Sequence, residues 1–299
     1  MARILISGAT GFIGKPLADY FLAKGHQVVK LVRSENLDAT ADAIFWNPDA
    51  GKAIKGHFER FDAVIHLAGE PVMGRWTRRK KQKILYSRTV GTWFLAQILA
   101  QLFQPPQFFL SASAIGIYGD RGEEILTEES EAGRGFLATV CCEWEKASKA
   151  IESRGIRTVR ARFGMVLGPH GGALQKMALP YKLGLGGRLG SGKQWISWVA
   201  REDLIRAIDH CFLTEMLEGP VNIAAPRSVR QEDFSKTLAE LLNRPSAVPL
   251  PAWFLRLIFG GMADEVLLSS ARVEPVKLLE SGFSFHYPLL IDALRKALK

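Results

Sequence analysis

The chain has 299 residues and a formal net charge of +9, and 47% of its residues are hydrophobic while 23% are charged. This composition is that of an ordinary soluble globular protein. It excludes a transmembrane segment, because the most apolar stretch, residues 251–261, is short and contains Arg256. The length suits one doubly wound domain with a smaller lobe for substrate binding.

The cysteines and the N-terminus predict a cytoplasmic protein without membrane contact. Cys141 and Cys142 are adjacent and Cys211 is a third, so a disulfide framework is not expected. The first residues form a strand pattern and not a cleavable apolar leader. The densest basic run, residues 75–83, predicts a solvated helix start, with the rim of a site for an anionic cofactor or substrate as the alternative. A single local run of this kind does not predict nucleic-acid binding.

The first predicted elements are a strand at residues 4–7 and an amphipathic helix at residues 15–24, joined by three glycines spaced three apart. This pattern is typical of a dinucleotide-binding turn. Gly8 allows the tight turn, Gly11 lets backbone approach a pyrophosphate, and Gly14 lets the helix pack closely on the strand. Free N–H groups at the helix start favour phosphate binding. The predicted cofactor contacts in the turn are Gly8, Thr10, Gly11, Phe12, Ile13 and Gly14.

Strands and helices continue to alternate through the first half of the chain, which is typical of a parallel sheet. Further strands are predicted at residues 27–32, 43–46, 63–67, 108–111 and 158–163, and further helices at residues 79–102 and 139–153. The fold class predicted from this pattern is α/β, a Rossmann doubly wound parallel sheet with a smaller C-terminal α/β substrate lobe.

The composition of the sequence changes after Gly168, where a stretch rich in glycine is followed by two tryptophans. Glycine-rich loops with aromatic residues often form a substrate wall, and we interpret Gln194, Trp195 and Trp198 as substrate-side residues. The rest of the chain predicts helices at residues 200–212, 231–242, 252–259, 276–281 and 288–298, and a strand at residues 221–223.

Two arginines bear on the identity of the cofactor. The second strand ends without the acidic residue that holds the ribose 2′-hydroxyl of NAD, and Arg33 stands there instead. An arginine at this place pairs with a 2′-phosphate, which favours NADP, whereas the alternative is an exposed loop arginine. Arg88 lies inside the apolar stripe of the helix at residues 79–102 and needs a partner. A cofactor or substrate anion would supply one, and a buried carboxylate is the alternative.

The motifs resemble those of the extended short-chain dehydrogenase/reductases, which include sugar-nucleotide epimerases and dehydratases. The resemblance rests on GATGFIG at residues 8–14, DAVIHLAG at 62–69 and SASAIGIYG at 111–119. The chain is most similar to the "epimerase family" branch, sometimes labelled cell-division inhibitors. The branch is indicated by GMVLGPHGG at residues 164–172, GSGKQ at 190–194 and LLESGFSF at 278–285.

The resemblance implies an NADP-binding Rossmann domain at residues 1–168. Residues 169–299 would form mostly the substrate lobe, together with some elements that return to the Rossmann domain. Residues 249–297 would be a family-specific C-terminal segment. Leu67, Ala68 and Gly69 would line the adenosine–ribose side of the cleft, and Val166 would touch the nicotinamide half through its backbone. Arg88 would face that half as well. Ser113 matches the family's catalytic serine, with a turn-capping hydroxyl as the alternative.

The usual Tyr–Lys pair of the superfamily is missing. Its positions fall on Leu137 and Cys141, or on Phe136 and Val140 after a slip of one residue. Proton transfer in the ordinary mechanism needs a titratable group there. Tyr118 is interpreted as a packed wall residue, and Cys141 and His66 as buried core residues. No spacing of His, Cys, Asp or Glu predicts a metal site.

These observations predict an NADP(H)-binding oxidoreductase, similar to nucleotide-sugar epimerases, that acts on a small molecule. The alternative is a non-catalytic NADP-binding regulatory or scaffold protein with a link to cell division. A homodimer is the candidate assembly, and neither nucleic acid nor membrane is an expected partner.

Overall fold

The computed structural model describes residues 1–33, 42–53 and 55–299. In these residues the main sheet has eight strands in the order β12-β8-β6-β5-β1-β2-β3-β4, parallel except for the last pair. Its strands are β1 (Arg3–Ser7), β2 (Gln27–Val32), β3 (Ala43–Asn47), β4 (Lys52–Ala53), β5 (Ala63–His66), β6 (Phe108–Ala114), β8 (Arg157–Phe163) and β12 (Gly219–Ile223).

The chain begins in the middle of this sheet. Strand β1 pairs with β2 on one side, where Ile4 faces Val28, and with β5 on the other, where Ile4 faces Ala63. The order of the strands therefore reverses beside β1, and ligands of doubly wound sheets bind at such a reversal, outside the carboxyl ends of the strands. The inner strands are apolar on both faces because helices cover both.

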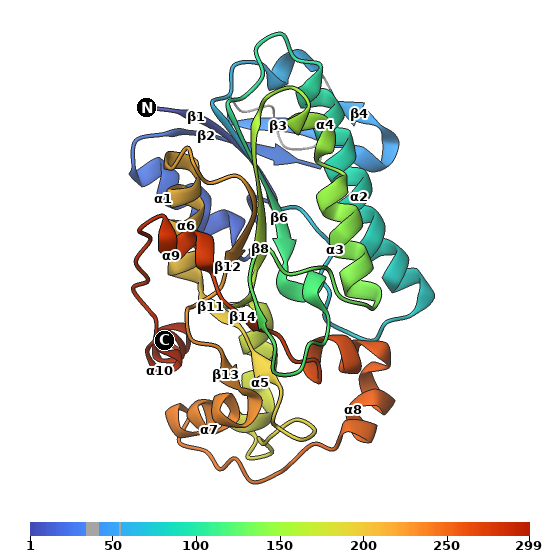
Figure 1. The fold of residues 1–299 in the computed structure, drawn as a ribbon, viewed down its shortest axis with the longest axis vertical. Helices are drawn as coiled ribbons and strands as arrows, with labels where there is room; N and C mark the ends of the chain where they lie inside the picture. The colour runs from blue at the N-terminus through green and yellow to red at the C-terminus, as the bar shows by residue number, and fades with distance from the viewer. Residues whose placement is uncertain (34–41, 54) are drawn as a thin grey trace.

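Helices on the two faces bury separate cores (Figure 1). On one face lie α1 (Gly14–Ala23), α6 (Arg201–Leu213) and α9 (Val276–Glu280), and on the other lie α2 (Arg78–Ala100), α3 (Phe136–Lys146) and α4 (Lys149–Glu152). Leu17 and Leu204 are fully buried on the first face, and Leu95 and Leu99 on the second.

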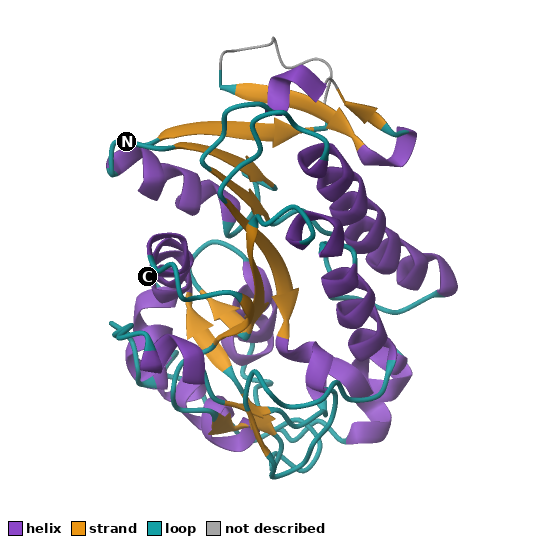
Figure 2. Cartoon of the chain, turned by 45° about the horizontal axis from the view of Figure 1, so that its top comes forward, coloured by secondary structure: helices purple, strands orange, loops and turns teal. Residues whose placement is uncertain are grey.

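A smaller lobe gathers at one end of the sheet, and Figure 2 shows its short strands and helices below the main strands. Its helices are α5 (Gly172–Lys182), α7 (Gln231–Leu241), α8 (Ala252–Phe259) and α10 (Leu290–Ala297). Its short strands form three pairs: β9 (Met165–Leu167) with β11 (Trp198–Ala200), β10 (Trp195–Ile196) with β13 (Val229–Arg230), and β7 (Ile125–Leu126) with β14 (Arg272–Val273). The predicted fold class is confirmed.

Two sequence-based element predictions need correction. The helix predicted at residues 139–153 begins earlier, at Phe136, and is divided into α3 and α4. The glycine-rich stretch contains helix α5, which the sequence did not predict because the helix starts at Gly172 and contains Pro180. Within the part of the chain that the structure describes, no helix is long and apolar enough to cross a membrane.

Candidate functional site

The glycine turn after β1 has the geometry that its sequence predicts. Gly8 has a φ of +68°, and a Cβ there would lie 3.0 Å from the backbone nitrogen of Ala68. A Cβ on Gly14 would lie 2.1 Å from the carbonyl oxygen of Gly8, so only glycine lets α1 pack at this distance. Thr10 and Gly11 are exposed at the tip of the turn. The first N–H groups of α1 therefore lie next to an open stretch of backbone, which fits a bound phosphate.

Phe12, from the same turn, is enclosed by the C-terminal half of the chain. A Cβ on Gly171 or Gly172 would lie 2.8 Å from its ring. The guanidinium of Arg201 lies over the ring and donates to the carbonyl oxygens of Phe12 (3.4 Å) and Pro169 (3.0 Å). Arg201 was missed by sequence reasoning, because α6 is far from the turn in the chain.

The strip that follows β5, Leu67 to Gly69, is fixed by two buried side chains. The Ser7 hydroxyl accepts hydrogen bonds from the backbone N–H groups of Leu67 (3.1 Å) and Ala68 (3.3 Å), and lies 2.6 Å from Nδ1 of His66. His66 is fully buried, and burial lowers its pKa to about 4. The strip therefore lies directly against the glycine turn at the switch point of the sheet.

Arg33 is exposed at the end of β2. Its charge reaches Glu70, because the pKa of Glu70 is lowered first by a hydrogen bond from Lys80 and further by the charges of Lys83 and Arg33. Cationic side chains from the end of β2 and the start of α2 thus lie around Glu70, at the carboxyl end of the sheet. A gathering of this kind suits a phosphate group.

Arg88 projects from α2 toward Gly69, where a Cβ would lie 3.4 Å from the guanidinium carbon. It donates to the carbonyl oxygens of Glu70 (2.9 Å) and Ile84 (3.2 Å), and it lies over the ring of Trp144. Burial lowers its pKa. Among the described residues no carboxylate lies within ion-pair distance of it, so the buried-carboxylate alternative from the sequence is wrong.

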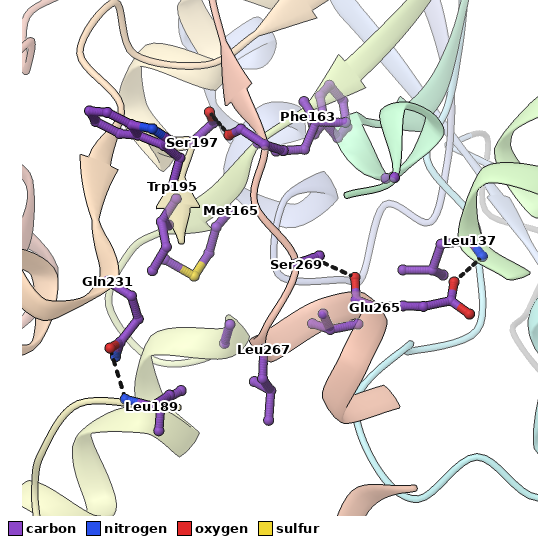
Figure 3. Close-up of a pocket in the computed structure, with 18 of the residues that line it drawn as sticks. Leu137, Phe163, Met165, Leu189, Trp195, Ser197, Gln231, Glu265, Leu267 and Ser269 are labelled. Carbon is purple, nitrogen blue, oxygen red and sulfur yellow. Dashed lines mark hydrogen bonds between the residues drawn. The ribbon is translucent and has the colours of Figure 1, made fainter. Parts of the chain in front are cut away.

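A cavity of about 260 Å³ opens at the carboxyl ends of β6 and β8 (Figure 3). Its wall combines the loop after β6, strands β9 and β10, helices α3, α5 and α7, and a π-helical turn at Ala263–Leu267. Most of the wall is apolar, and its members include Ile115, Gly116, Leu137, Phe163, Met165, Met177, Trp195 and Leu267. Leu137, which occupies the expected tyrosine position, is thus a wall residue. Cys141 is buried behind Gly116, and burial raises its thiol pKa to about 12.

Glu265 carries the ionisable side chain of this wall. Its carboxylate accepts hydrogen bonds from the backbone N–H groups of Phe136 (3.0 Å) and Leu137 (2.7 Å), and so caps the start of α3 (Figure 3). Sequence reasoning missed Glu265, because its partners lie 128 and 129 residues away in the chain. The one signal available was that two acidic residues, Asp264 and Glu265, stand between apolar residues.

The predicted substrate-side residues are only partly brought together. Trp195 lines the cavity. Gln194 is buried and donates to the carbonyl oxygens of Leu189 and Leu267, so it joins two loops instead of facing the cavity. The prediction that Trp198 is a substrate-side residue is wrong, because Trp198 is fully buried in the core of the smaller lobe and does not line the cavity. Val166 lies in β9 next to the cavity residue Met165, and its side chain packs on the core under α1 and α6.

Ser113 also departs from its predicted place. It is buried, and its hydroxyl donates to Oε1 of Glu145 (2.8 Å), which in turn pairs with Arg162. The cavity wall begins after β6, at Ile115 and Gly116, and Ser113 is not part of it. Tyr118 belongs to the same network, since its hydroxyl accepts from Arg162 and donates to Asn222. We therefore assign Ser113 to a buried network and not to the cavity wall.

Within the described ranges, no three His, Cys, Asp or Glu side chains are grouped as a metal site would need. The three cysteines are free thiols.

Comparison with known proteins covers nearly the whole chain. Residues 4–224 match the NAD dependent epimerase/dehydratase family, and residues 250–297 match a domain of unknown function, DUF1731. The epimerase family protein YfhF of Bacillus subtilis is 37% identical over 295 residues, which cover 98% of this chain and 96% of that relative.

Two solved structures are similar in fold and sequence. The human epimerase family protein SDR39U1, solved with NADPH, superposes with a TM-score of 0.89 at 30% identity, over 99% of this chain and 98% of that one. The nucleoside-diphosphate sugar epimerase of Corynebacterium glutamicum superposes with a TM-score of 0.83 at 32% identity, over 99% of this chain but 58% of that one.

Proposed function

This chain belongs to the NAD dependent epimerase/dehydratase family, and on that premise we propose that it binds NADP(H) and acts as an oxidoreductase on a small molecule. The observation that carries the proposal is that two features lie outside the carboxyl ends of strands of the same parallel sheet. The glycine turn follows β1 at the switch point, and the apolar cavity opens at the carboxyl ends of β6 and β8. The human relative with NADPH supports the choice of cofactor.

The described residues fit an NADP molecule. The absence of Cβ atoms at Gly8 and Gly14 lets the turn pack against Ala68 and lets α1 pack against the turn, and the N–H groups of α1 would hold the pyrophosphate. Arg33 would pair with the 2′-phosphate and Arg88 would face the nicotinamide half, where its unpaired charge would meet a cofactor oxygen. The bound cofactor would supply the hydride. The cavity wall would hold the substrate and exclude water from it.

Cofactor binding tests the proposal directly. We expect wild-type protein to bind NADPH about tenfold or more tightly than NADH, because a charge-assisted phosphate contact is worth roughly 1.5–3 kcal/mol. Arg33→Ala should remove most of that preference while leaving the NADH affinity unchanged. Arg154→Ala, at an exposed arginine after α4, is the matched control and should change neither value. Equal binding of both cofactors by the wild type would overturn the NADP assignment.

A second candidate function is a non-catalytic NADP-binding regulator. The observation that favours it is the apolar character of the former Tyr–Lys positions, since Leu137 is a wall residue and Cys141 is a buried thiol. Oxidation of NADPH by carbonyl compounds would separate the two functions. Turnover that depends on cavity residues supports the oxidoreductase, whereas tight NADPH binding without turnover of any carbonyl compound favours the regulator.

A further inference from the structure

The charge of the cavity wall differs from what a nucleotide sugar needs. Among the described residues that line the cavity, Glu265 is the ionisable one, and no lysine, arginine or histidine accompanies it. Methionines from three segments, Met73, Met165 and Met177, also line the cavity. Methionine side chains adapt to apolar ligands of varied shape. The wall is therefore apolar with a single negative charge.

The negative charge is built into the fold. Two backbone N–H groups at the start of α3 hold both carboxylate oxygens of Glu265, and the positive end of the helix favours the charge there. Gly135 precedes the helix, and a Cβ at that residue would lie 3.0 Å from the carboxylate. The carboxylate is thus held at the wall, and it cannot turn away from an incoming ligand without leaving these N–H groups unsatisfied.

Two arginines beside the cavity residue Trp195 do not place their charge inside the cavity. Arg230 and Arg272 lie over the ring of Trp195, and neither lines the cavity. Arg230 is held by both carboxylate oxygens of Glu123. A diphosphate is normally bound by arginines or lysines. In this cavity it would meet a carboxylate in a poorly solvated space, where repulsion between like charges is strong.

The polar groups of the wall are also engaged with the protein. Ser197 donates to the carbonyl oxygen of Ala271, Ser269 donates to that of Glu265, and the indole of Trp195 donates to Glu123. Gln231 accepts from the backbone of Leu189. A sugar ring brings several hydroxyl groups that each need a partner when buried. A wall with few available partners favours a ligand with one polar group.

We propose that the cavity selects an uncharged, largely apolar carbonyl compound or alcohol, and that Glu265 is the specificity residue that rejects anionic ligands, nucleoside diphosphate sugars included. The inference rests on the proposed function, because it names the substrate class of the same site. It also gives the C-terminal segment a role, since Glu265 lies within residues 250–297, which match the domain of unknown function.

Ligand binding to the NADPH-saturated protein tests the proposal without requiring turnover. The probes are 3-phenylpropan-1-ol, its carboxylate analogue 3-phenylpropanoate, and UDP-glucose, measured by calorimetry or ligand-observed NMR. We expect the wild type to bind the alcohol at least about tenfold more tightly than the carboxylate, and not to bind UDP-glucose in the cavity. Glu265→Gln should raise the affinity for 3-phenylpropanoate about tenfold and leave the alcohol within about threefold.

Two further variants separate charge from structure. Asp264→Asn removes the neighbouring carboxylate, which is exposed and pairs with Arg256, and should leave all three affinities unchanged. Met177→Lys adds a cation to the wall without touching the cap of α3, and should also raise the affinity for 3-phenylpropanoate. This second variant keeps the test valid if Glu265→Gln unfolds α3.

The proposal is overturned if the wild type binds 3-phenylpropanoate or UDP-glucose as tightly as the alcohol, or if the alcohol does not bind at millimolar concentration. It is equally overturned if neither Glu265→Gln nor Met177→Lys changes the discrimination. NADPH affinity is measured in the same samples. Failure of the wild type to bind NADPH would contradict the proposed function. Binding of NADPH without a preference for the alcohol would contradict only the substrate class.

Discussion

The guanidinium carbon of Arg201 lies 4.8 Å from the centre of the Phe12 ring, which joins the first turn of the chain to the start of α6. The contact is close because Gly168 has no side chain, and a Cβ there would lie 2.9 Å from Arg201. Gly171 and Gly172 abut the same phenyl ring. The glycine-rich segment after β9 therefore packs against the glycine turn after β1 as well as leading into the smaller lobe.

This contact predicts the effect of Gly172→Ala. The residue has a φ of +69°, and the new Cβ would lie 2.8 Å from the Phe12 ring, so the turn has to shift. We expect NADPH affinity to fall about tenfold and the free energy of unfolding to fall by about 1–3 kcal/mol. Gly184→Ala is the matched control, because Gly184 has a similar φ of +75° but open space around it. It should cost about 1 kcal/mol and leave NADPH binding intact. Unchanged NADPH affinity in Gly172→Ala would show that the turn tolerates movement of Phe12.

His66 gives the protein a pH dependence of defined sign. Burial lowers its pKa from 6.5 in the unfolded chain to about 4 in the folded state, so the unfolded state binds more protons between these values. Stability from this group is complete above pH 6.5 and is lost as the pH falls toward 4, by roughly 3 kcal/mol in total. Denaturant unfolding at several pH values measures it. His66→Asn should lack this part of the slope.

The control for that experiment is His170→Asn. His170 is exposed and has a φ of +57°, a conformation that asparagine tolerates. Its replacement should leave the slope between pH 6.5 and 4 as in the wild type. If the free energy of unfolding of His66→Asn depends on pH as steeply as that of the wild type, the acid sensitivity comes from other buried groups.

Local patterns were enough to predict most of the fold. The strand, the glycines and the helix of the first turn follow one another in sequence, and their packing depends on nearest neighbours, as the approach of Gly14 to Gly8 shows. The alternation of apolar strands and amphipathic helices likewise fixes the parallel sheet. Helix α5 was missed because local propensity disfavours glycine and proline, and tertiary packing overrides that preference.

The candidate site was less predictable, because its side chains meet across long distances in the chain. Nothing near Glu265 in the sequence indicates that it caps α3. Serine and tryptophan are residue types suited to a site, but the positions of Ser113 and Trp198 along their strands direct both side chains into the protein interior. A shift of one residue along a strand reverses the face, and residue type alone does not resolve it.

The network around Ser113 leads to a test of its role. Ser113→Ala should lower the free energy of unfolding by about 1 kcal/mol, the typical value of one hydrogen bond, and leave NADPH binding unchanged. Glu145→Gln should cost more, about 3–5 kcal/mol, because it removes the charge that neutralises the buried Arg162. Denaturant unfolding measures both. Loss of turnover in Ser113→Ala with stability retained would restore the serine as a group that contacts substrate.

The cofactor contact that we propose for Arg88 implies a cost in stability. Its guanidinium is largely buried and meets carbonyl oxygens and an indole ring instead of a carboxylate, so its charge is poorly compensated. Arg88→Met keeps the length of the side chain and removes the charge. We expect the variant without cofactor to be as stable as the wild type or more stable, since a buried charge is relieved. NADPH affinity should nevertheless fall about tenfold, because the cofactor loses a charge-assisted hydrogen bond.

Thermal unfolding with and without NADPH checks both parts of this expectation. The wild type should gain more stability from the cofactor than Arg88→Met, because stabilisation by a ligand follows its affinity. Arg79→Met is the control, since Arg79 is exposed on the same helix and should leave both values unchanged. If Arg88→Met unfolds more easily and binds NADPH normally, the role of the arginine is to hold the backbone at Glu70. Arg88 would then not be a contact of the nicotinamide half of the cofactor.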